Sequence, residues 1–168
     1  METAVVQIRQ ARPGDAPTLA EIHAIAWRGA YQGIIPHLSL ERMIARRGKE
    51  WWRLALAERQ PPLVLDFGGE AIGYTTFGRC RSGRPPFQGE IFELYLHPTY
   101  QGLGFGERLF EGARQRLAGR RFKGLLVWAL ADNDGACSFY LRLGGKPVAE
   151  GAERFGDVSL RKVAFAWA

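Results

Sequence analysis

The sequence predicts an α/β fold of the α+β type, in which a mixed, mainly antiparallel sheet is flanked by helices. Strand-like apolar runs gather in the middle and at the end of the chain, amphipathic helical stretches lie before and between them, and one glycine-rich turn joins a strand directly to a helix. With 168 residues and 46% hydrophobic content, the chain fits one domain, 1–168, around a single core.

The first third of the chain predicts one strand and two helical stretches. Val5–Gln10 reads as the strand. A helix is expected to begin after Asp15, whose side chain would cap its first N–H groups, and to run to about Ala30. A second helical stretch is expected from Ser39 to Glu58, with a break around Gly48.

The middle of the chain predicts three strands. Leu63–Phe67 and Glu70–Phe77 are apolar runs separated by Gly68-Gly69, a pair typical of a two-residue hairpin turn. A loop rich in glycine and proline follows. The next strand, Glu90–His97, ends at Pro98 and leads into the glycine-rich turn.

The last part predicts two helices and three strands. The helix that follows the glycine-rich turn is amphipathic, and an apolar strand, Gly124–Ala131, comes after it. A fourth helix has its apolar stripe between Ala136 and Leu143, and Pro147–Glu153 and Val158–Trp167 read as closing strands.

The glycine-rich turn has the chemistry of an anion cradle. Gly102, Gly104 and Gly106 lack side chains, so consecutive N–H groups can converge on phosphate oxygens at the start of a helix. The turn fails the dinucleotide fingerprint, because Glu107 stands where the third glycine is required, and no Gly-Lys-Ser/Thr follows as in a phosphate loop of the Walker type. The turn therefore predicts a different phosphorylated cofactor, with an ordinary strand-to-helix turn as the alternative.

Two ordered motifs resemble the GNAT superfamily of acyl-CoA N-acyltransferases. Gln101, two residues, Gly104, one residue and Gly106 match its pyrophosphate loop. The family's second cofactor motif is matched after the strand that ends at Ala131, by Asn133, Ala136, Phe139, Tyr140 and Gly144. The N-terminal segment is similar to one bacterial GNAT subgroup, so the resemblance covers nearly the whole chain. It implies a sheet of six to seven strands, about four helices, and two central parallel strands that splay apart around acyl-CoA.

The resemblance implies acetyl-CoA as the co-substrate and assigns its contacts. Main-chain groups of Leu94, Tyr95 and Leu96 would hold the pantetheine arm and the oxyanion. Asn133 would contact the cofactor or simply cap a helix, and Arg108 could reach a phosphate. The pyrophosphate would meet the loop formed by Gln101, Gly102, Leu103, Gly104, Phe105 and Gly106.

Acyl transfer to an amine needs a base, because an alkylammonium titrates near a pKa of about 10.4 and only its neutral form attacks. The resemblance makes Glu93 the base, acting through ordered water; a strand glutamate paired with an arginine is the alternative, and Glu90 is a lesser candidate. Strand alternation predicts one face with Ile91, Glu93, Tyr95 and His97 and the other with Phe92, Leu94 and Leu96.

The resemblance makes Tyr140 the acid that assists the leaving thiolate, although an aromatic residue on an apolar helix stripe also fits the core. Trp27 and Tyr31 are expected either to line the acceptor cleft or to anchor the first helix. Cys137 has no evident histidine partner, so a covalent acyl-enzyme is disfavoured and direct transfer in a ternary complex is expected. A small-molecule amine and a protein amine both stay open as acceptors. An acyl-CoA-binding sensor without turnover is the alternative from another class.

Composition excludes several other functions. The two cysteines and three histidines are scattered, so no metal is expected. The net charge of +6 comes largely from arginines, which read either as a solvated surface or as a source of attraction for coenzyme A phosphates or an acidic substrate; nucleic-acid binding is disfavoured. No apolar run reaches 18 residues, so neither membrane spanning nor secretion is expected and a cytoplasmic protein is the default. The oligomeric state is open, a homodimer included.

Two positions depart from the family pattern. Gly145 stands where members usually have phenylalanine, which leaves the packing below the second motif in question. Gln101 replaces the commoner arginine, which removes a charge from the loop but none of its N–H donors.

Overall fold

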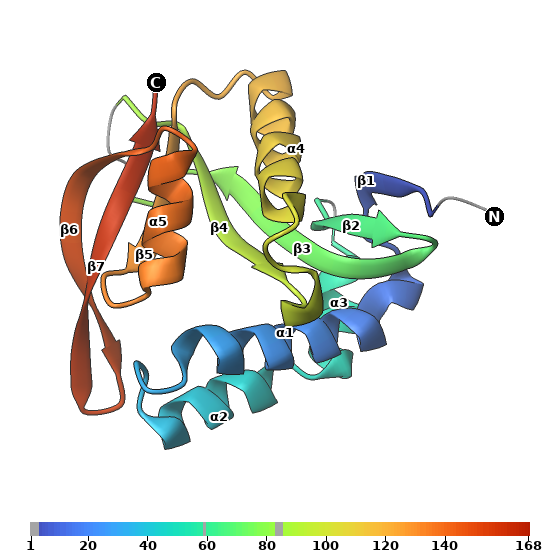
Figure 1. Cartoon of the computed structure of the whole chain (residues 1–168), viewed down its shortest axis with the longest axis horizontal. Coiled ribbons are helices and arrows are strands. Elements are labelled where there is room, and N and C mark those ends of the chain that lie inside the picture. Colours follow the sequence, from blue (N-terminus) through green and yellow to red (C-terminus); the bar gives the residue numbers. More distant parts are fainter. Residues whose placement is uncertain (1–3, 59, 83–85) are drawn as a thin grey trace.

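The computed structural model describes residues 4–58, 60–82 and 86–168. Within this part of the chain, seven strands form one sheet in the order β1-β2-β3-β4-β5-β7-β6 (Figure 1). The strands are β1 (Val6–Gln10), β2 (Leu63–Phe67), β3 (Glu70–Arg79), β4 (Gly89–Leu96), β5 (Leu125–Leu130), β6 (Lys146–Phe155) and β7 (Val158–Trp167). The helices are α1 (Ala16–Tyr31), α2 (His37–Arg46), α3 (Lys49–Leu56), α4 (Phe105–Gly119) and α5 (Asp134–Arg142), with short 3-10 helices η1 (Pro13–Asp15) and η2 (Pro98–Tyr100).

The predicted fold class is confirmed. Only β4 and β5 pair in parallel, and every other neighbouring pair in the sheet is antiparallel. Gly68 and Gly69 both have positive φ, as the predicted hairpin turn between β2 and β3 requires. The predicted break at Gly48 separates α2 from α3, with Gly48 at the N-cap of α3.

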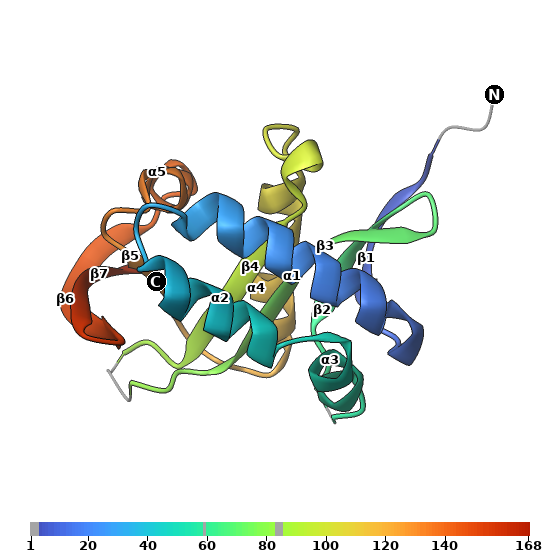
Figure 2. The same cartoon turned by 90° about the horizontal axis from the view of Figure 1, so that it is seen from below.

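Helices cover both faces of the sheet. Consecutive residues of β2 show the two layers: Val64 packs with Leu19 of α1 and Trp52 of α3, whereas Leu65 packs with Leu109 of α4. Both β2 side chains are completely buried, as expected for a strand with a helix layer on each side. Seen from below, the helices α5 and α3 lie on opposite sides of the strands (Figure 2).

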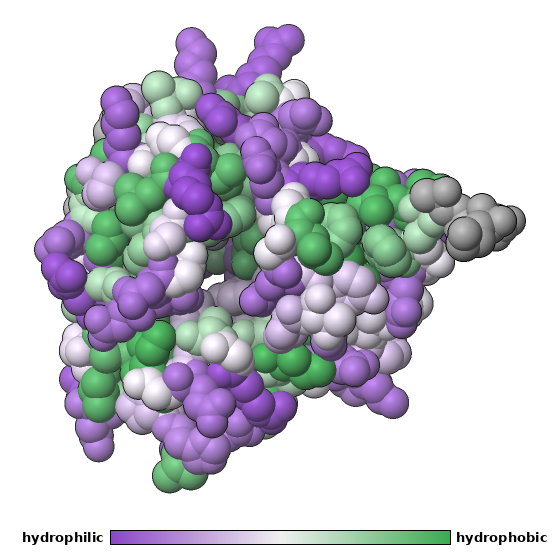
Figure 3. All heavy atoms as spheres, in the orientation of Figure 1, coloured by the Kyte–Doolittle hydropathy of each residue, from purple (hydrophilic) through white to green (hydrophobic). Residues whose placement is uncertain are grey.

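The central parallel strands splay apart as predicted. β4 and β5 pair only from Gly89 to Ile91 and from Leu125 to Val127, so the rest of β4 runs on without β5 beside it. The surface is hollowed in the middle of the molecule, between the part that carries α4 and α5 and the layer formed by α1 (Figure 3). This opening is where the two parallel strands separate.

A β-bulge in β4 overturns the predicted face of Ile91. Thr76 of β3 faces Glu93 and the next residue, Phe77, faces Ile91, so Phe92 is the extra residue on β4. As a result Ile91 packs in the core under α4, whereas Glu93 and Phe92 line the same cavity on the other face. Simple alternation was wrong here, because one inserted residue reverses the face of every residue on one side of it.

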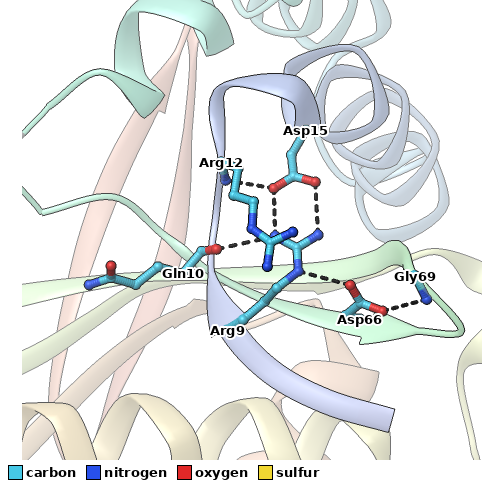
Figure 4. Close-up of polar contacts among 6 residues, drawn as sticks. All are labelled: Arg9, Gln10, Arg12, Asp15, Asp66 and Gly69. Atoms are coloured by element: carbon cyan, nitrogen blue, oxygen red, sulfur yellow. Dashed lines mark hydrogen bonds and ion pairs between the residues drawn. The ribbon is translucent and has the colours of Figure 1, made fainter. Parts of the chain in front are cut away.

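The start of α1 is held by an ion-pair network, and this corrects the role expected of Asp15. Its carboxylate does not cap α1 but accepts from the Arg12 N–H at 2.6 Å and from the Arg9 guanidinium at 2.8 and 3.0 Å (Figure 4). Arg9 also donates to Asp66 at 2.8 Å, and Asp66 accepts from the Gly69 N–H at 2.7 Å. Burial alone would raise the pKa of Asp15, but the bonds from Arg9 and Arg12 outweigh it and lower that pKa. The network fixes α1, which carries Trp27 and Tyr31, to the sheet.

None of the helices in the described part of the chain combines the length and the hydropathy that a membrane crossing requires.

Candidate active site

A cavity of about 820 Å³ lies where β4 leaves β5. Its walls come from the second half of α1, the end of β4, the glycine-rich turn and α5. Of the residues predicted for the cofactor, those that line it are Leu94, Tyr95, Leu96, Gln101, Gly102, Gly104, Gly106, Asn133 and Tyr140. The two motifs are separated in the sequence, and the fold brings both of them to the walls of one cavity.

The glycine-rich turn has the backbone geometry of an anion cradle. Gly102 and Gly104 have φ of +79° and +83°, in the left-handed region that favours glycine. Gly104 is the N-cap of α4, and no described side chain caps that helix, so its first N–H groups are open to a ligand. A Cβ on Gly106 would lie 3.2 Å from the Phe139 ring, so glycine here lets α4 approach α5 closely.

Asn133 and Tyr140, at the α5 wall of the cavity, each have a structural contact and also line the cavity, so the structure is compatible with both of the roles that the sequence left open. Asn133 is the N-cap of α5, where its Oδ1 accepts from the Ala136 N–H at 3.2 Å, and it also lines the cavity. Tyr140 is 6% exposed and packs against Phe110 and Trp167, yet it too lines the cavity. Burial raises the pKa of Tyr140, so its hydroxyl stays protonated.

Three of the residues predicted to contact the cofactor do not line this cavity. Leu103 is 64% exposed at the tip of the turn, and Phe105 packs between Phe67 and Tyr100. The Arg108 side chain donates to the Val6 carbonyl at 3.4 Å. Cofactor contacts by these three residues stay predictions, and for Phe105, the first residue of α4, the predicted contact is its main-chain N–H.

A second cavity, of about 600 Å³, lies on the α1–α2 face of the sheet. Tyr95 lines both cavities, so they approach each other at the part of β4 that has no strand partner on the β5 side. The predicted acceptor residues Trp27 and Tyr31 both line this second cavity and also pack on an apolar cluster with Ile35 and Phe155. The Tyr31 and Tyr95 hydroxyls are hydrogen-bonded at 2.5 Å.

Glu93 lines this second cavity, and its two carboxylate oxygens differ in their hydrogen bonds. Oε2 accepts from Arg47 Nη1 at 2.8 Å and from the Tyr74 hydroxyl at 2.9 Å. Among the described residues, Oε1 has only a long contact of 3.4 Å, from Thr76 Oγ1. The predicted alternative of a strand glutamate paired with arginine therefore describes Oε2, while Oε1 is the oxygen left for other partners.

The sequence model of the Acetyltransferase (GNAT) family matches residues 26–145, well over half of the chain. The protein belongs to this family. An uncharacterised N-acetyltransferase of Bacillus subtilis, YuaI, is 26% identical over 163 residues, which cover 97% of this chain and 93% of that protein.

Solved structures show the same fold. The PaiA N-acetyltransferase of Thermoplasma acidophilum, solved in complex with coenzyme A, superposes with a TM-score of 0.75 at 21% identity, covering 94% of this chain and 98% of that one. YncA, a putative acetyltransferase of Salmonella typhimurium solved with acetyl-CoA, gives a TM-score of 0.68 at 21% identity, with coverage of 96% and 92%.

Sequence reasoning missed two residues of this GNAT acetyltransferase that hold Glu93. Arg47 lies just after α2, in no motif, and its guanidinium stacks at 4.2 Å on the Trp51 ring and at 5.0 Å on the Trp52 ring. Tyr74 is fully buried on β3, directly opposite Tyr95 in the register. Hairpin pairing of β3 with β4 is the signal that could have found Tyr74; no local signal identifies Arg47.

A covalent route through Cys137 has no support in the site. Burial, together with the nearby Asp134 charge, raises the pKa of the Cys137 thiol, and the thiol donates toward the carbonyls of Leu130 and Ala131. Glu90, the lesser candidate for the base, is 2% exposed and accepts from the Arg81 backbone and side chain at 3.0 and 2.9 Å. Within the described residues, no three His, Cys, Asp or Glu side chains gather as a metal site would need.

Proposed function

We propose that this GNAT acetyltransferase transfers the acetyl group of acetyl-CoA to a primary amine by direct attack within a ternary complex. The observation that carries the proposal is the meeting of two cavities at Tyr95. A thioester in the glycine-loop cavity and an amine in the second cavity would approach from opposite faces of the sheet. Neither an acyl-enzyme nor a long movement of the acetyl group is then required.

The acetyl-CoA would be held by backbone groups. The glycine-rich turn and the uncapped start of α4 offer N–H groups and a positive helix end to the pyrophosphate. The part of β4 beyond the β5 pairing offers main-chain groups of Leu94, Tyr95 and Leu96 to the pantetheine arm and to the oxyanion that develops on the acetyl carbonyl.

Glu93 would take the proton of the amine through a bridging water. Arg47 and Tyr74 fix one carboxylate oxygen, which orients the group and leaves Oε1 as the acceptor that faces the incoming ammonium. A carboxylate held in this way supplies both attraction for the cationic amine and a destination for its proton.

Tyr140 would assist the leaving thiolate. A thiol has a pKa of about 8.5, whereas burial raises the pKa of Tyr140 above the ordinary tyrosine value, so full proton transfer from Tyr140 to the thiolate is uphill. Its contribution as general acid is therefore chiefly a hydrogen bond donated to the sulfur as charge develops there.

Steady-state kinetics of two variants, with acetyl-CoA affinity measured by calorimetry alongside, test these roles. Glu93→Gln is expected to lower kcat by about 10²- to 10⁴-fold, and Tyr140→Phe by about 10- to 100-fold, with acetyl-CoA affinity nearly unchanged in both. Wild-type turnover in both variants would show that the residue assignments are wrong. Tight acetyl-CoA binding by a wild-type protein that acetylates no amine or peptide would favour the sensor alternative.

A further inference from the structure

The hydroxyls of Tyr31 and Tyr95 form a pair near the place where the two cavities approach each other. Their oxygens are 2.5 Å apart, so the bond joins the last residue of α1 to β4. Both residues line the second cavity, and among the described residues Tyr95 alone also lines the cavity beside the glycine-rich turn. The pair therefore lies on the acceptor side, next to the proposed place of acetyl transfer.

The Tyr95 side chain is held in one position. Its ring centre lies 5.7 Å from that of Trp27, 5.9 Å from that of Tyr74 and 6.3 Å from that of Tyr31. The bond to Tyr31 then fixes the far end of the side chain, which carries the hydroxyl. A side chain that is held at both its ring and its hydroxyl offers its oxygen to a ligand in a defined place.

The pair keeps hydrogen-bonding capacity for a ligand. Two hydroxyls have two hydrogens and four lone pairs, and their mutual bond uses one of each. Burial first, and also the nearby Glu93 charge, raise the pKa of both hydroxyls, so both stay protonated at neutral pH. The pair can therefore accept a further hydrogen bond without gaining or losing a proton.

The proposed base lies close to this pair. Glu93 and Tyr95 are two residues apart on β4 and both line the second cavity, so they share one face of the strand. At about 3.3 Å per residue, their Cα atoms are about 7 Å apart. This is a short enough separation for one nitrogen to bond directly to the Tyr95 hydroxyl and, through one water, to Glu93.

The hydrogens of a primary ammonium have different destinations during acetyl transfer. The nitrogen lone pair forms the C–N bond, and when the C–S bond breaks its electron pair leaves on sulfur. Of the three N–H hydrogens, one passes as a proton through the bridging water to Glu93, a second neutralises the thiolate, and the third stays on the amide. Only the hydrogen that is retained can keep one hydrogen bond throughout the reaction.

We propose that the Tyr95 hydroxyl accepts a hydrogen bond from the retained N–H of the acceptor, and that Tyr31 is a positioning residue which holds this hydroxyl beside the thioester. The proposal rests on the proposed function, because it adds a contact to that reaction. The bond turns the nitrogen so that its lone pair faces the thioester carbon, the orientation that attack requires. It also selects primary amines, because a secondary amine gives an amide that has no N–H.

Matched primary and N-methyl amines test this contact. The pairs are 2-phenylethylamine with N-methyl-2-phenylethylamine, pentylamine with N-methylpentylamine, and a peptide that begins with alanine with its N-methylalanine counterpart. Acetyl-CoA is saturating, thiol release is the readout, and the pair whose primary amine gives the highest wild-type kcat/KM is used for the variants. The wild type is expected to prefer the primary amine by about tenfold or more.

Three Tyr→Phe variants locate the cause. In Tyr95→Phe, kcat/KM should fall about tenfold for the primary amine and less than about twofold for the N-methyl amine, so much of the preference is lost. Tyr31→Phe keeps the Tyr95 hydroxyl but removes its tether, and should lower the preference about two- to fivefold. Tyr100→Phe is the matched control: its ring packs on Phe67 and Phe105 and lines neither cavity, so the preference should stay unchanged.

The outcomes separate the two proposals. A purely structural role of Tyr95 would lower kcat/KM equally for both amines in Tyr95→Phe; that result, or a wild type with no preference, overturns the Tyr95 contact and leaves the proposed acetyl transfer standing. An unchanged preference in Tyr31→Phe overturns the positioning role of Tyr31. Refusal of all three primary amines and of a mixed peptide pool by the wild type overturns the proposed function, and this proposal with it.

Discussion

Lowering the pH from 7 to 5 is expected to cost this protein about 2 kcal/mol of stability through one residue, His23. His23 is completely buried on α1, with its ring 4.4 Å from the Trp27 ring and 6.0 Å from that of Trp52, and neither ring nitrogen has a hydrogen-bond partner among the described residues. Burial first, and then the Arg47 charge, lower the pKa of His23 from 6.5 to about 3.

The direction of this change in stability follows from proton binding. Between these two pKa values the unfolded chain binds a proton at His23 and the native protein does not, so stability falls as the pH falls. The native pKa is about 3 and the unfolded pKa is 6.5, so only the unfolded state takes up a proton between pH 7 and pH 5. The loss of stability is RT times the logarithm of the ratio of the quantity 1 + 10^(pKa − pH) for the unfolded state at pH 5 to its value at pH 7, which is about 2 kcal/mol. Protonation would place a second cation beside Arg47, which itself holds Glu93.

Urea unfolding at pH 7 and pH 5 measures this loss. His23→Gln does not titrate, so the variant should lose about 2 kcal/mol less than the wild type between the two pH values, whatever its stability at pH 7. His37→Gln changes an exposed histidine at the start of α2 and should follow the wild type. Equal pH dependence in the wild type and His23→Gln would refute a neutral, buried His23.

Three further predictions concern the contacts that shape the site. Arg47→Met should destabilise the fold by about 3 kcal/mol, because it leaves a largely buried carboxylate unpaired, and adding Glu93→Gln should recover part of that loss in a double-mutant cycle. Gly145→Ala should cost about 1–3 kcal/mol in thermal unfolding, because its Cβ would lie 2.6 Å from the Trp167 ring. Asn133→Ala should cost about 1 kcal/mol through the lost cap and should also weaken acetyl-CoA binding, whereas Asn133→Asp should restore stability but not affinity.

Specific results would contradict each of these. Additive effects of the Arg47 and Glu93 substitutions would mean that their 2.8 Å contact carries no coupling. A Gly145→Ala variant as stable as the wild type would mean that the Trp167 ring yields freely. If Asn133→Asp restored acetyl-CoA affinity as well as stability, Asn133 would act on the cofactor only through the helix cap.

Features that depend on neighbouring residues in the chain were predictable from the sequence. The glycine-rich turn, the hairpin at Gly68-Gly69 and the break at Gly48 follow from local backbone chemistry, and the structure has all three. The bulge at Phe92 was not predictable, because it is a property of the pairing between β3 and β4. Arg47 was missed for a similar reason: it reaches Glu93 across 46 positions of the chain, and no motif joins them.

The departure at Gly145 from the family pattern has a local explanation in the fold. The space that a side chain at this position would enter is filled from β7 by Trp167, whose ring lies 4.9 Å from that of Phe110 and whose Nε1–H donates to the Leu143 carbonyl at 3.0 Å. An aromatic ring therefore still packs below the second motif, supplied by another strand. Because Trp167 also contacts Tyr140 ring to edge at 6.0 Å, it helps to fix the tyrosine that lines the cofactor cavity. The glycine and the tryptophan thus act as one unit, and a larger residue at 145 would disturb the position of Tyr140 before it disturbed the glycine-rich turn.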